Sequence, residues 1–228
     1  MKVNNPFRDL TKFELCLWFF SMAVILLSFA FSQGGWLEAF SSLIGVTALI
    51  FVAKGYVLGQ VLTVVFSVFY GVISFFFGYY GEMITYLFMT APMAVMSVIS
   101  WVRHPYKGSK EVEISHLSPK KLILMSVLAA VVTFIFYFIL KALGNANLIF
   151  SVISVTTSFI AVYLTFLRSP YYALGYAAND VVLIILWILA SMESISYLPM
   201  VMCFVMFLFN DIYGFYNWHK MRKHQENT

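Results

Sequence analysis

The chain is poor in charged residues and in cysteine. Only 11% of its 228 residues are Asp, Glu, Lys or Arg, against roughly a quarter in an average soluble domain. Its 2 cysteines, Cys16 and Cys203, both lie in apolar runs without a second Cys or a His at metal-ligand spacing, so we expect neither a disulfide nor a metal site. All 4 histidines lie in hydrophilic segments, which removes the usual proton relay within a membrane from consideration.

Sequence motifs of enzymes are also missing. The chain has no nucleophile-elbow glycines, no Walker loop, no HExxH and no cluster of paired His and Cys residues. We therefore expect neither an enzyme nor a cofactor, and this chain alone is not an ATP-driven pump. Its Lys and Arg residues are scattered over short loops, which favours membrane topology over nucleic-acid binding as their explanation.

Apolar sequence fills the chain instead, at 62% hydrophobic residues. A membrane helix needs about 20 mainly apolar residues. The first apolar run is too long for a signal peptide and lacks a small-x-small cleavage site, so we expect it to be retained. We predict an all-α integral membrane protein with eight transmembrane helices, over about 13–32, 37–53, 57–78, 82–101, 120–141, 148–167, 171–191 and 197–218.

Basic residues predict the orientation of these helices. With the N-terminus in the cytoplasm, 13 of the 14 Lys and Arg residues lie on the cytoplasmic side, and Lys141 alone lies outside. An even number of helices returns the C-terminus to the cytoplasm. The outer loops are short and carry Glu38, Glu82 and Glu193.

The two halves of the chain look alike. Glu82-Met-Ile-Thr-Tyr-Leu-Phe-Met89 and Glu193-Ser-Ile-Ser-Tyr-Leu-Pro-Met200 share Glu, Ile, a hydroxyl residue, Tyr, Leu and Met at one spacing, 111 residues apart, and each opens a predicted helix. Gly59 and Gly175 also match near the starts of two helices. Chance matching in an apolar sequence is the alternative. Parallel repeats of this kind are typical of transporters with a site at the repeat interface.

The repeat and the polar stretches give the expected domain organisation. Ser118 and Pro119 are suited to start a helix after the one sizeable loop, and Trp101 and Trp218 are predicted to anchor the two bundles at the membrane interface. The predicted parts are an N-terminal segment with an additional helix (1–35), a first three-helix bundle (36–102), a cytoplasmic loop (103–119), a linker helix (120–147), a second three-helix bundle (148–218) and a basic tail (219–228).

Two Asn-Asp pairs, Asn179-Asp180 and Asn210-Asp211, lie inside apolar runs. An ionisable side chain at membrane depth costs several kcal/mol, so it indicates a functional site; structural pairing with Asn or Tyr is the alternative. A pocket of amides, carboxylates, hydroxyls and aromatics suits a polyhydroxylated ligand with a flat or cationic ring. The candidate substrate-binding residues are Asn179, Asp180, Trp187, Asn210, Asp211, Gln60, Tyr70, Thr90 and Asn217, and the candidate hinges are Pro92 and Pro199.

Several of these motifs resemble one known family. Gly81-Glu-Met-Ile-Thr-Tyr86, Ser100-Trp-Val-Arg-His-Pro105, Ala178-Asn-Asp-Val-Val182, Ser196-Tyr-Leu-Pro-Met200 and Asn210-Asp-Ile-Tyr-Gly-Phe-Tyr-Asn-Trp218 are similar to the PnuC family of bacterial vitamin B3 transporters, specifically its nicotinamide riboside type, over about residues 37–222. The resemblance implies a fold like that of full-length SWEET sugar transporters and a homotrimer in the inner membrane.

It also implies facilitated diffusion, with the substrate trapped by a cytoplasmic riboside kinase. The ribose would meet Asn179, Asp180, Asn210 and Gln60, and the cationic ring would meet Trp187 or Tyr70. Relatives that move thiamine, riboflavin or deoxynucleosides share the fold, so another vitamin or nucleoside is an alternative substrate. An alternative from another class is a membrane sensor or scaffold subunit that docks a partner through the loop 103–119 and the basic tail.

Overall fold

The computed structural model describes residues 5–32, 35–76, 80–145 and 147–227. Within these ranges eight helical spans are long and apolar enough to cross a membrane, and two isolated β-bridges take the place of strands, which confirms the predicted all-α membrane fold. The helices are α1 (Lys12–Ser32), α2 (Trp36–Ala53), α3 (Val57–Phe76), α4 (Tyr80–Ile84), α5 (Ala91–Arg103), α6 (Pro119–Ala142), α7 (Leu148–Phe166), α8 (Tyr172–Glu193) and α9 (Leu198–Glu226). A π-helical segment, Thr85–Thr90, joins α4 to α5, and short 3₁₀ turns occupy Pro6–Asp9, Tyr106–Gly108 and Ile195–Tyr197.

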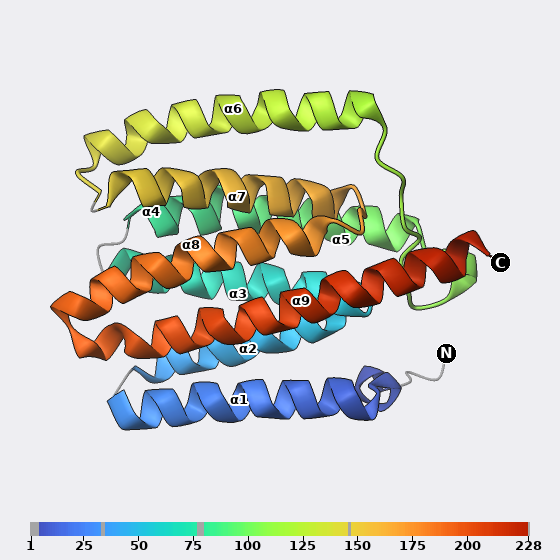
Figure 1. Ribbon diagram of the computed structural model, residues 1–228, viewed down its shortest axis with the longest axis horizontal. Coiled ribbons are helices and arrows are strands. Elements are labelled where there is room, and N and C mark those ends of the chain that lie inside the picture. Colours follow the sequence, from blue (N-terminus) through green and yellow to red (C-terminus); the bar gives the residue numbers. More distant parts are fainter. Residues whose placement is uncertain (1–4, 33–34, 77–79, 146, 228) are drawn as a thin grey trace.

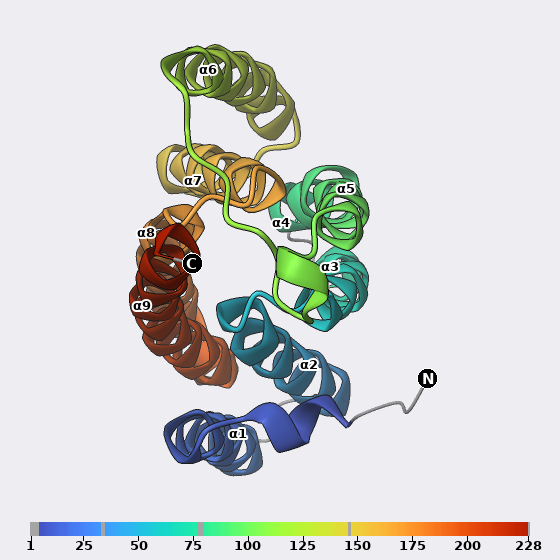
Figure 2. The same ribbon diagram turned by 90° about the vertical axis from the view of Figure 1, so that its right-hand side faces the viewer.

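Helices α2, α3, α5, α7, α8 and α9 form a closed ring (Figure 2). Each packs on the next, and α9 returns to pack on α2. In one half α3 packs between α2 and α5, and in the other α8 packs between α7 and α9, so both halves have the same arrangement. Helix α1 lies outside the ring against α2 and α9, and α6 lies outside against α7.

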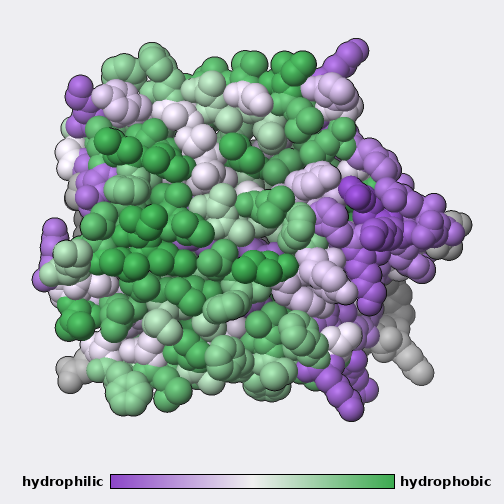
Figure 3. Space-filling model, in the orientation of Figure 1, coloured by the Kyte–Doolittle hydropathy of each residue, from purple (hydrophilic) through white to green (hydrophobic). Residues whose placement is uncertain are grey.

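Both ends of the described chain lie at one end of the molecule, together with the loop between α5 and α6 (Figure 1). Hydrophilic residues gather at this end, while apolar side chains cover most of the remaining face in view (Figure 3). We call it the basic end, because the helix ends and the loop that meet there carry Lys54, Lys110, Arg168 and Lys220. The opposite end carries the turn between α8 and α9.

Two glycines let neighbouring helices approach closely at matching places in the two halves. A Cβ atom on Gly59 of α3 would lie 2.4 Å from the backbone nitrogen of Val52 in α2. A Cβ atom on Gly175 of α8 would lie 2.8 Å from the Cα atom of Ala161 in α7. Both distances are too short for any side chain, so each half needs glycine at its first helix–helix contact.

Two tryptophans join the halves at the basic end. The Trp101 Nε1 atom of α5 donates to the Thr165 carbonyl of α7 at 3.0 Å, and the Trp218 Nε1 atom of α9 donates to the Val52 carbonyl of α2 at 2.9 Å. The side chains are 1% and 0% exposed, with ring centroids 5.4 Å apart. The prediction that they anchor the protein at the membrane interface is wrong, because both indole groups find their acceptors inside the ring.

The repeated Glu-to-Met motif does not occupy equivalent places. Glu82 lies in the first turn of α4, as predicted. The second copy leads into the eighth span, which begins at Ile195. Its Glu193, however, is the last residue of α8, and the 3₁₀ turn Ile195–Tyr197 lies before α9. The glycine and tryptophan pairs are therefore the better guide to the repeat.

The predicted basic tail is part of a helix, because α9 continues to Glu226. Its last turns hold the loop between α5 and α6: the Gln225 Oε1 atom accepts from the Ile114 backbone N–H at 2.8 Å, and Gln225 Nε2 donates to the Val112 carbonyl at 3.1 Å. The loop ends as predicted, with the Ser118 hydroxyl accepting from the Lys121 N–H and Pro119 in the first turn of α6.

Helix α1 is fastened to the ring by polar contacts. Glu14 is 1% exposed; its Oε2 atom accepts from the Thr11 backbone N–H, and the Thr11 hydroxyl accepts from the Glu14 N–H, which is a capping box. Lys54 Nζ lies 3.2 Å from the same carboxylate, and the Tyr213 hydroxyl donates to it at 2.8 Å. A buried carboxylate is thus balanced by a cation and by hydrogen bonds.

We predict that the tryptophan contacts contribute strongly to stability. Replacing Trp218 by Ala empties a fully buried site and should lower the free energy of unfolding by about 3–5 kcal/mol. Replacing it by Phe keeps most of the volume and should cost about 1 kcal/mol for the lost hydrogen bond. Thermal unfolding of the unmodified protein and of both variants, in the same detergent, measures this difference in stability.

Trp36 offers the control, because it is 75% exposed. Its replacement by Ala should leave the midpoint close to that of the unmodified protein, while Trp101→Ala should act like Trp218→Ala. A midpoint for Trp218→Ala no lower than that for Trp36→Ala contradicts the role assigned to the buried pair.

Candidate functional site

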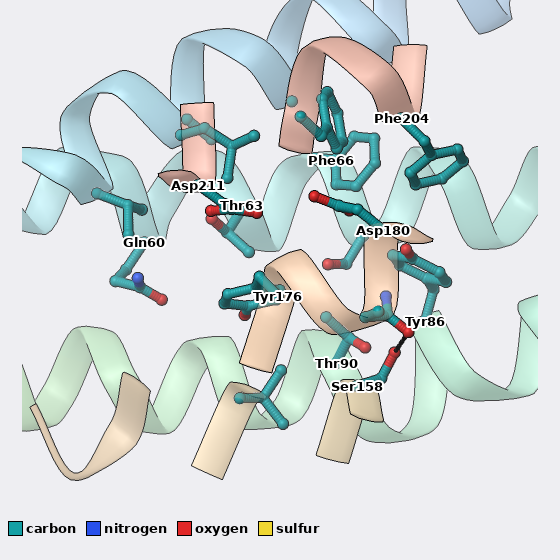
Figure 4. A pocket seen from close by; sticks show the side chains of 18 residues that line it. Gln60, Thr63, Phe66, Tyr86, Thr90, Ser158, Tyr176, Asp180, Phe204 and Asp211 are labelled. Carbon is teal, nitrogen blue, oxygen red and sulfur yellow. Dashed lines mark hydrogen bonds between the residues drawn. The ribbon is translucent and has the colours of Figure 1, made fainter. Parts of the chain in front are cut away.

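The ring encloses a central cavity of about 50 Å³. A water molecule needs about 10–15 Å³, so this form of the cavity has room for a few waters. Figure 4 shows the polar side chains that point into it from α3, α7, α8 and α9. The lining residues are Gly45, Ala48, Leu49, Val52, Gln60, Thr63, Phe66, Ser67, Tyr86, Thr90, Ser158, Val162, Tyr176, Asn179, Asp180, Phe204, Phe207 and Asp211.

Helix α3 supplies one polar stripe. Gln60, Thr63 and Ser67 recur every three or four residues, so they share one face of the helix, and all three line the cavity. Gln60 and Ser67 are buried. The stripe continues to Tyr70 and Ser74, which line a neighbouring cavity of about 300 Å³ toward the opposite end.

The π-helical segment brings Tyr86 and Thr90 into the lining. Its wider turn is closed by the Ala91 N–H, which donates to the Tyr86 carbonyl five residues back. Pro92 follows in the first turn of α5. Proline has no backbone N–H to donate, and it lies where the π-helical segment changes to α-helix. The fourth span, Tyr80–Arg103, is therefore not a regular α-helix where it passes the cavity.

Pro199 is placed differently from the prediction. It lies in the first turn of α9, not in the interior of the helix. A first-turn proline removes no intrahelical hydrogen bond, so the reason for expecting a bend at Pro199 does not hold.

Asn179 lies where α8 faces α7. Its Oδ1 atom accepts hydrogen bonds from the hydroxyls of Ser154, Thr157 and Ser158, at 3.3, 2.9 and 3.0 Å. These hydroxyl groups fix the orientation of the Asn179 amide, whose neighbour in the helix is Asp180.

Asp180 of α8 and Asp211 of α9 bring their carboxyl groups together at the cavity wall (Figure 4). Each residue is 3% exposed, and the two carboxyl groups lie within hydrogen-bonding reach of each other. No N–H or O–H group of the described residues donates to Asp180 Oδ2. The pair is therefore a concentration of acidic groups without a partner of opposite charge.

Four predicted site residues lie away from the central cavity. Tyr70 and Trp187 line the neighbouring cavity of about 300 Å³ toward the opposite end, where the Tyr70 and Tyr86 rings, 4.4 Å apart, stand between the two spaces. Asn210 faces α1 and donates to the Ser21 hydroxyl at 3.1 Å and to the Met206 carbonyl at 2.8 Å. Asn217 donates to the Ala53 carbonyl at 2.8 Å, which ties α9 to the end of α2.

The apolar part of the lining was missed by sequence reasoning. Phe66, Phe204 and Phe207 pack on one another around the cavity, with ring centroids of neighbouring pairs 5.5 Å apart. A chain with 24 phenylalanines gives no signal that singles these out. Tyr176 lies one helical turn before Asn179 and Asp180 and lines the same cavity.

The cavity has no cationic lining. Among the described residues that line it there is no Lys, Arg or His, and no group of three His, Cys, Asp or Glu side chains that could hold a metal ion occurs in the part of the chain covered by the structure. The arrangement suits a small polar ligand with hydroxyl groups and positive charge, because amide, hydroxyl and carboxyl groups meet aromatic rings there.

The chain is similar to known membrane transporters over most of its length. A nicotinamide riboside transporter PnuC of Neisseria mucosa is 27% identical over 223 residues, covering 95% of this chain and 84% of that protein. A nicotinamide riboside transporter PnuC of Haemophilus influenzae is 24% identical over 190 residues, covering 82% of this chain and 81% of that protein. The crystal structure of the vitamin B3 transporter PnuC superimposes with a TM-score of 0.82 at 25% identity, over 95% of this chain and 94% of that one. Residues 35–220 match the nicotinamide mononucleotide transporter family, and the chain therefore belongs to that family of membrane transporters.

Proposed function

We propose that the protein carries nicotinamide riboside across the membrane by facilitated diffusion. The observation that carries this proposal is the acidic cavity: Asp180 and Asp211 face it, and no Lys, Arg or His of the described residues lines it. The riboside has a cationic ring, which these carboxyl groups suit. The mononucleotide adds a phosphate, which would meet the same acidic groups without a cation to hold it. The names of the two relatives point to the riboside as well.

Within the cavity, Asp180 and Asp211 would face the positive ring, which would stack on Tyr86 or Phe66. Gln60, Thr90 and the hydroxyl-bound amide of Asn179 would bind the ribose hydroxyls. Tyr70 and Trp187 would meet the substrate earlier on its path, in the cavity toward the opposite end. Asn210 and Asn217 would support the helices and not the ligand.

The central cavity must widen for this ligand. Sites for small molecules usually have volumes from about 300 Å³, and the cavity here has about 50 Å³. We infer that this compact form is a closed form of the carrier. The π-helical segment and Pro92 offer a place for the widening, because Tyr86 and Thr90 would move with it.

The biological setting follows from the same reasoning. The basic end would face the cytoplasm of a bacterial inner membrane, with both termini inside, because Lys and Arg concentrate on that side of membrane proteins. Net uptake by a downhill carrier requires that the substrate be consumed, for which a cytoplasmic riboside kinase would serve. Each subunit of a homotrimer would work independently, because the ring around the cavity is built by one chain.

Transport by purified protein tests the proposal. Liposomes that contain the protein, with the same pH and salts on both sides, should take up labelled nicotinamide riboside until its concentrations are equal, whereas nicotinamide mononucleotide should enter much more slowly. Thiamine, riboflavin and deoxynucleosides serve as competitors. Stronger competition by one of these than by unlabelled riboside would reassign the substrate.

Two asparagines separate a binding role from a structural one. Asn179→Ala should weaken riboside binding by about tenfold or more, since it removes a polar group from the cavity. Asn217→Ala should leave the affinity unchanged and lower the thermal midpoint, because its amide bonds to the Ala53 carbonyl. Calorimetric titration and thermal unfolding of both variants measure the two effects, and equal losses of affinity would contradict this division.

A sensor or scaffold subunit is the alternative from another class. It would need the basic side chains at the end of α9 to dock a partner. Lys220 and Lys223 are exposed there. The double replacement Lys220→Gln and Lys223→Gln should leave riboside uptake unchanged in cells that depend on it, while Asp180→Ala should abolish uptake. The reverse pattern would favour docking.

A further inference from the structure

The last two carbonyl groups of α2 both accept hydrogen bonds from α9. The Val52 carbonyl accepts from the Trp218 indole at 2.9 Å, and the Ala53 carbonyl accepts from the Asn217 amide at 2.8 Å. Carbonyl groups at a helix end have no partner within the helix, so they are free to bind donors from elsewhere. Here a tryptophan and the residue before it provide these donors.

The last two carbonyl groups of α7 repeat this pattern with donors from α5. The Thr165 carbonyl accepts from the Trp101 indole at 3.0 Å, and the Phe166 carbonyl accepts from the Ser100 hydroxyl at 3.1 Å. Again the donors are a tryptophan and the residue before it. The two contacts between the halves at the basic end are therefore equivalent, atom by atom.

Each of these helix ends offers a third carbonyl group in the turn that follows it. The carbonyls belong to Gly55 after α2 and to Arg168 after α7, and both residues have a positive φ, 69° and 56°. Their donors come from the loop between α5 and α6: the Val112 N–H donates to Gly55 and the Ser115 N–H donates to Arg168, both at 3.0 Å. One short segment thus binds equivalent atoms of both halves.

We call this loop, residues 104–118, the strap, because it crosses the ring at the basic end (Figure 2). Two further contacts fasten it. The Gln225 amide of α9 forms two hydrogen bonds with its backbone, and an antiparallel bridge joins Glu111 to Tyr56 in the turn after α2. The strap is therefore attached to the turn after α2, to the turn after α7 and to the end of α9.

Buried aromatic rings lie between the central cavity and the strap. A row of rings begins at the cavity wall and consists of Tyr176, Tyr172, Trp218 and Trp101. Neighbouring ring centroids in this row are 6.2, 4.7 and 5.4 Å apart. Val112 of the strap packs in the same cluster and is 1% exposed. A ligand that leaves the cavity toward the basic end must therefore pass these rings and then the strap.

We propose that the strap is a lid over the exit at the basic end, and that it lifts off the turns after α2 and α7 when the substrate leaves the central cavity. The proposal rests on the proposed function in taking this cavity as the path of the substrate. The two turns belong to different halves, so the strap cannot remain bonded to both when the halves move apart.

The attachments of the strap suit this movement. Its bonds to Gly55 and Arg168 are single backbone hydrogen bonds, whose net contribution to stability is small, so they break without the unfolding of a helix. The two bonds from Gln225 keep the strap on α9 in the meantime. The strap then closes again on the same two carbonyl groups.

A reversible cross-link between the strap and the turn after α2 tests the lid. Opposite Cα atoms in an antiparallel bridge lie about 4.5–5.5 Å apart, within the range of a disulfide, so Tyr56→Cys and Glu111→Cys can be joined. The native Cys16 and Cys203 are first replaced by alanine. In liposomes, the oxidised variant should take up labelled nicotinamide riboside at least tenfold more slowly than the same protein after reduction with dithiothreitol.

Binding and a single-cysteine variant are the controls for the cross-link. The oxidised protein should still bind riboside in a calorimetric titration, because the strap lies outside the cavity. Glu111→Cys alone should transport equally with and without oxidant. Equal uptake by the cross-linked and the reduced protein would overturn the lid and leave the proposed function intact. Absence of uptake by the unmodified protein would overturn the proposed function.

Thiol labelling tests the lid without any substrate. In the protein without native cysteines, Val112→Cys should react slowly with a water-soluble maleimide, because the strap buries this position. Adding Gln225→Ala removes two hydrogen bonds from the strap and should speed the labelling about tenfold. Lys223→Gln, an exposed change on the same turn of α9, should leave the rate unchanged.

A second buried cysteine separates movement of the strap from general loosening of the protein. Val46 of α2 is 0% exposed and lies in a different buried cluster from the strap. Gln225→Ala should leave the labelling of Val46→Cys as slow as before. Equal acceleration at positions 46 and 112, or acceleration at neither, would overturn the proposal that the strap opens as a separate lid.

Discussion

The closed ring depends on hydrogen bonds that each half makes to the other. The indole of Trp101 in the first half donates to the last turn of α7, and the indole of Trp218 in the second half donates to the last turn of α2. Burying an indole N–H without a hydrogen bond would be costly. In both cases it donates to a backbone carbonyl in the last turn of a helix, which has no partner within that helix. Because the two bonds are reciprocal, neither half has its own buried polar groups satisfied without the other. This contact joins the two halves at the basic end of the ring.

Symmetry of the scaffold and asymmetry of the cavity have different origins. Gly59 and Gly175 set the helix spacing in the same way in both halves, because the backbone approach is the same. The charge differs: α8 and α9 contribute carboxyl groups, whereas α3 contributes an amide and hydroxyls at the facing positions. A ligand with a cationic ring at one end and a sugar at the other meets a different wall on each side. The parallel scaffold therefore permits one preferred orientation of such a ligand.

The spans and the acidic pair could be predicted from the sequence because long apolar runs and charges within them are strong local signals. Gln60, Thr90, Asn179, Asp180 and Asp211 were predicted as site residues, and all line the cavity. The spacing of residues along a helix predicts which side chains share a face, but not which neighbouring helix that face contacts. Asn210 and Asn217 share a helix with Asp211, yet they bond to α1 and α2. The aromatic lining, the burial of Trp101 and Trp218, and the salt bridge of Glu14 likewise depend on contacts between distant segments.

Helix α9 is continuous from the turn after α8 to the loop at the basic end, and this has a mechanical consequence. Along its length Asn210 contacts α1, Asp211 faces the cavity, Trp218 bonds to α2 and Gln225 bonds to the α5–α6 loop. A straight helix transmits tilt and rotation over its whole length. If Asp211 moves to admit a ligand, α9 moves as a rigid body, and the segments that it contacts elsewhere along its length move with it. The additional helix α1 and the loop then belong to the same moving body as the carboxyl group, although neither touches the cavity.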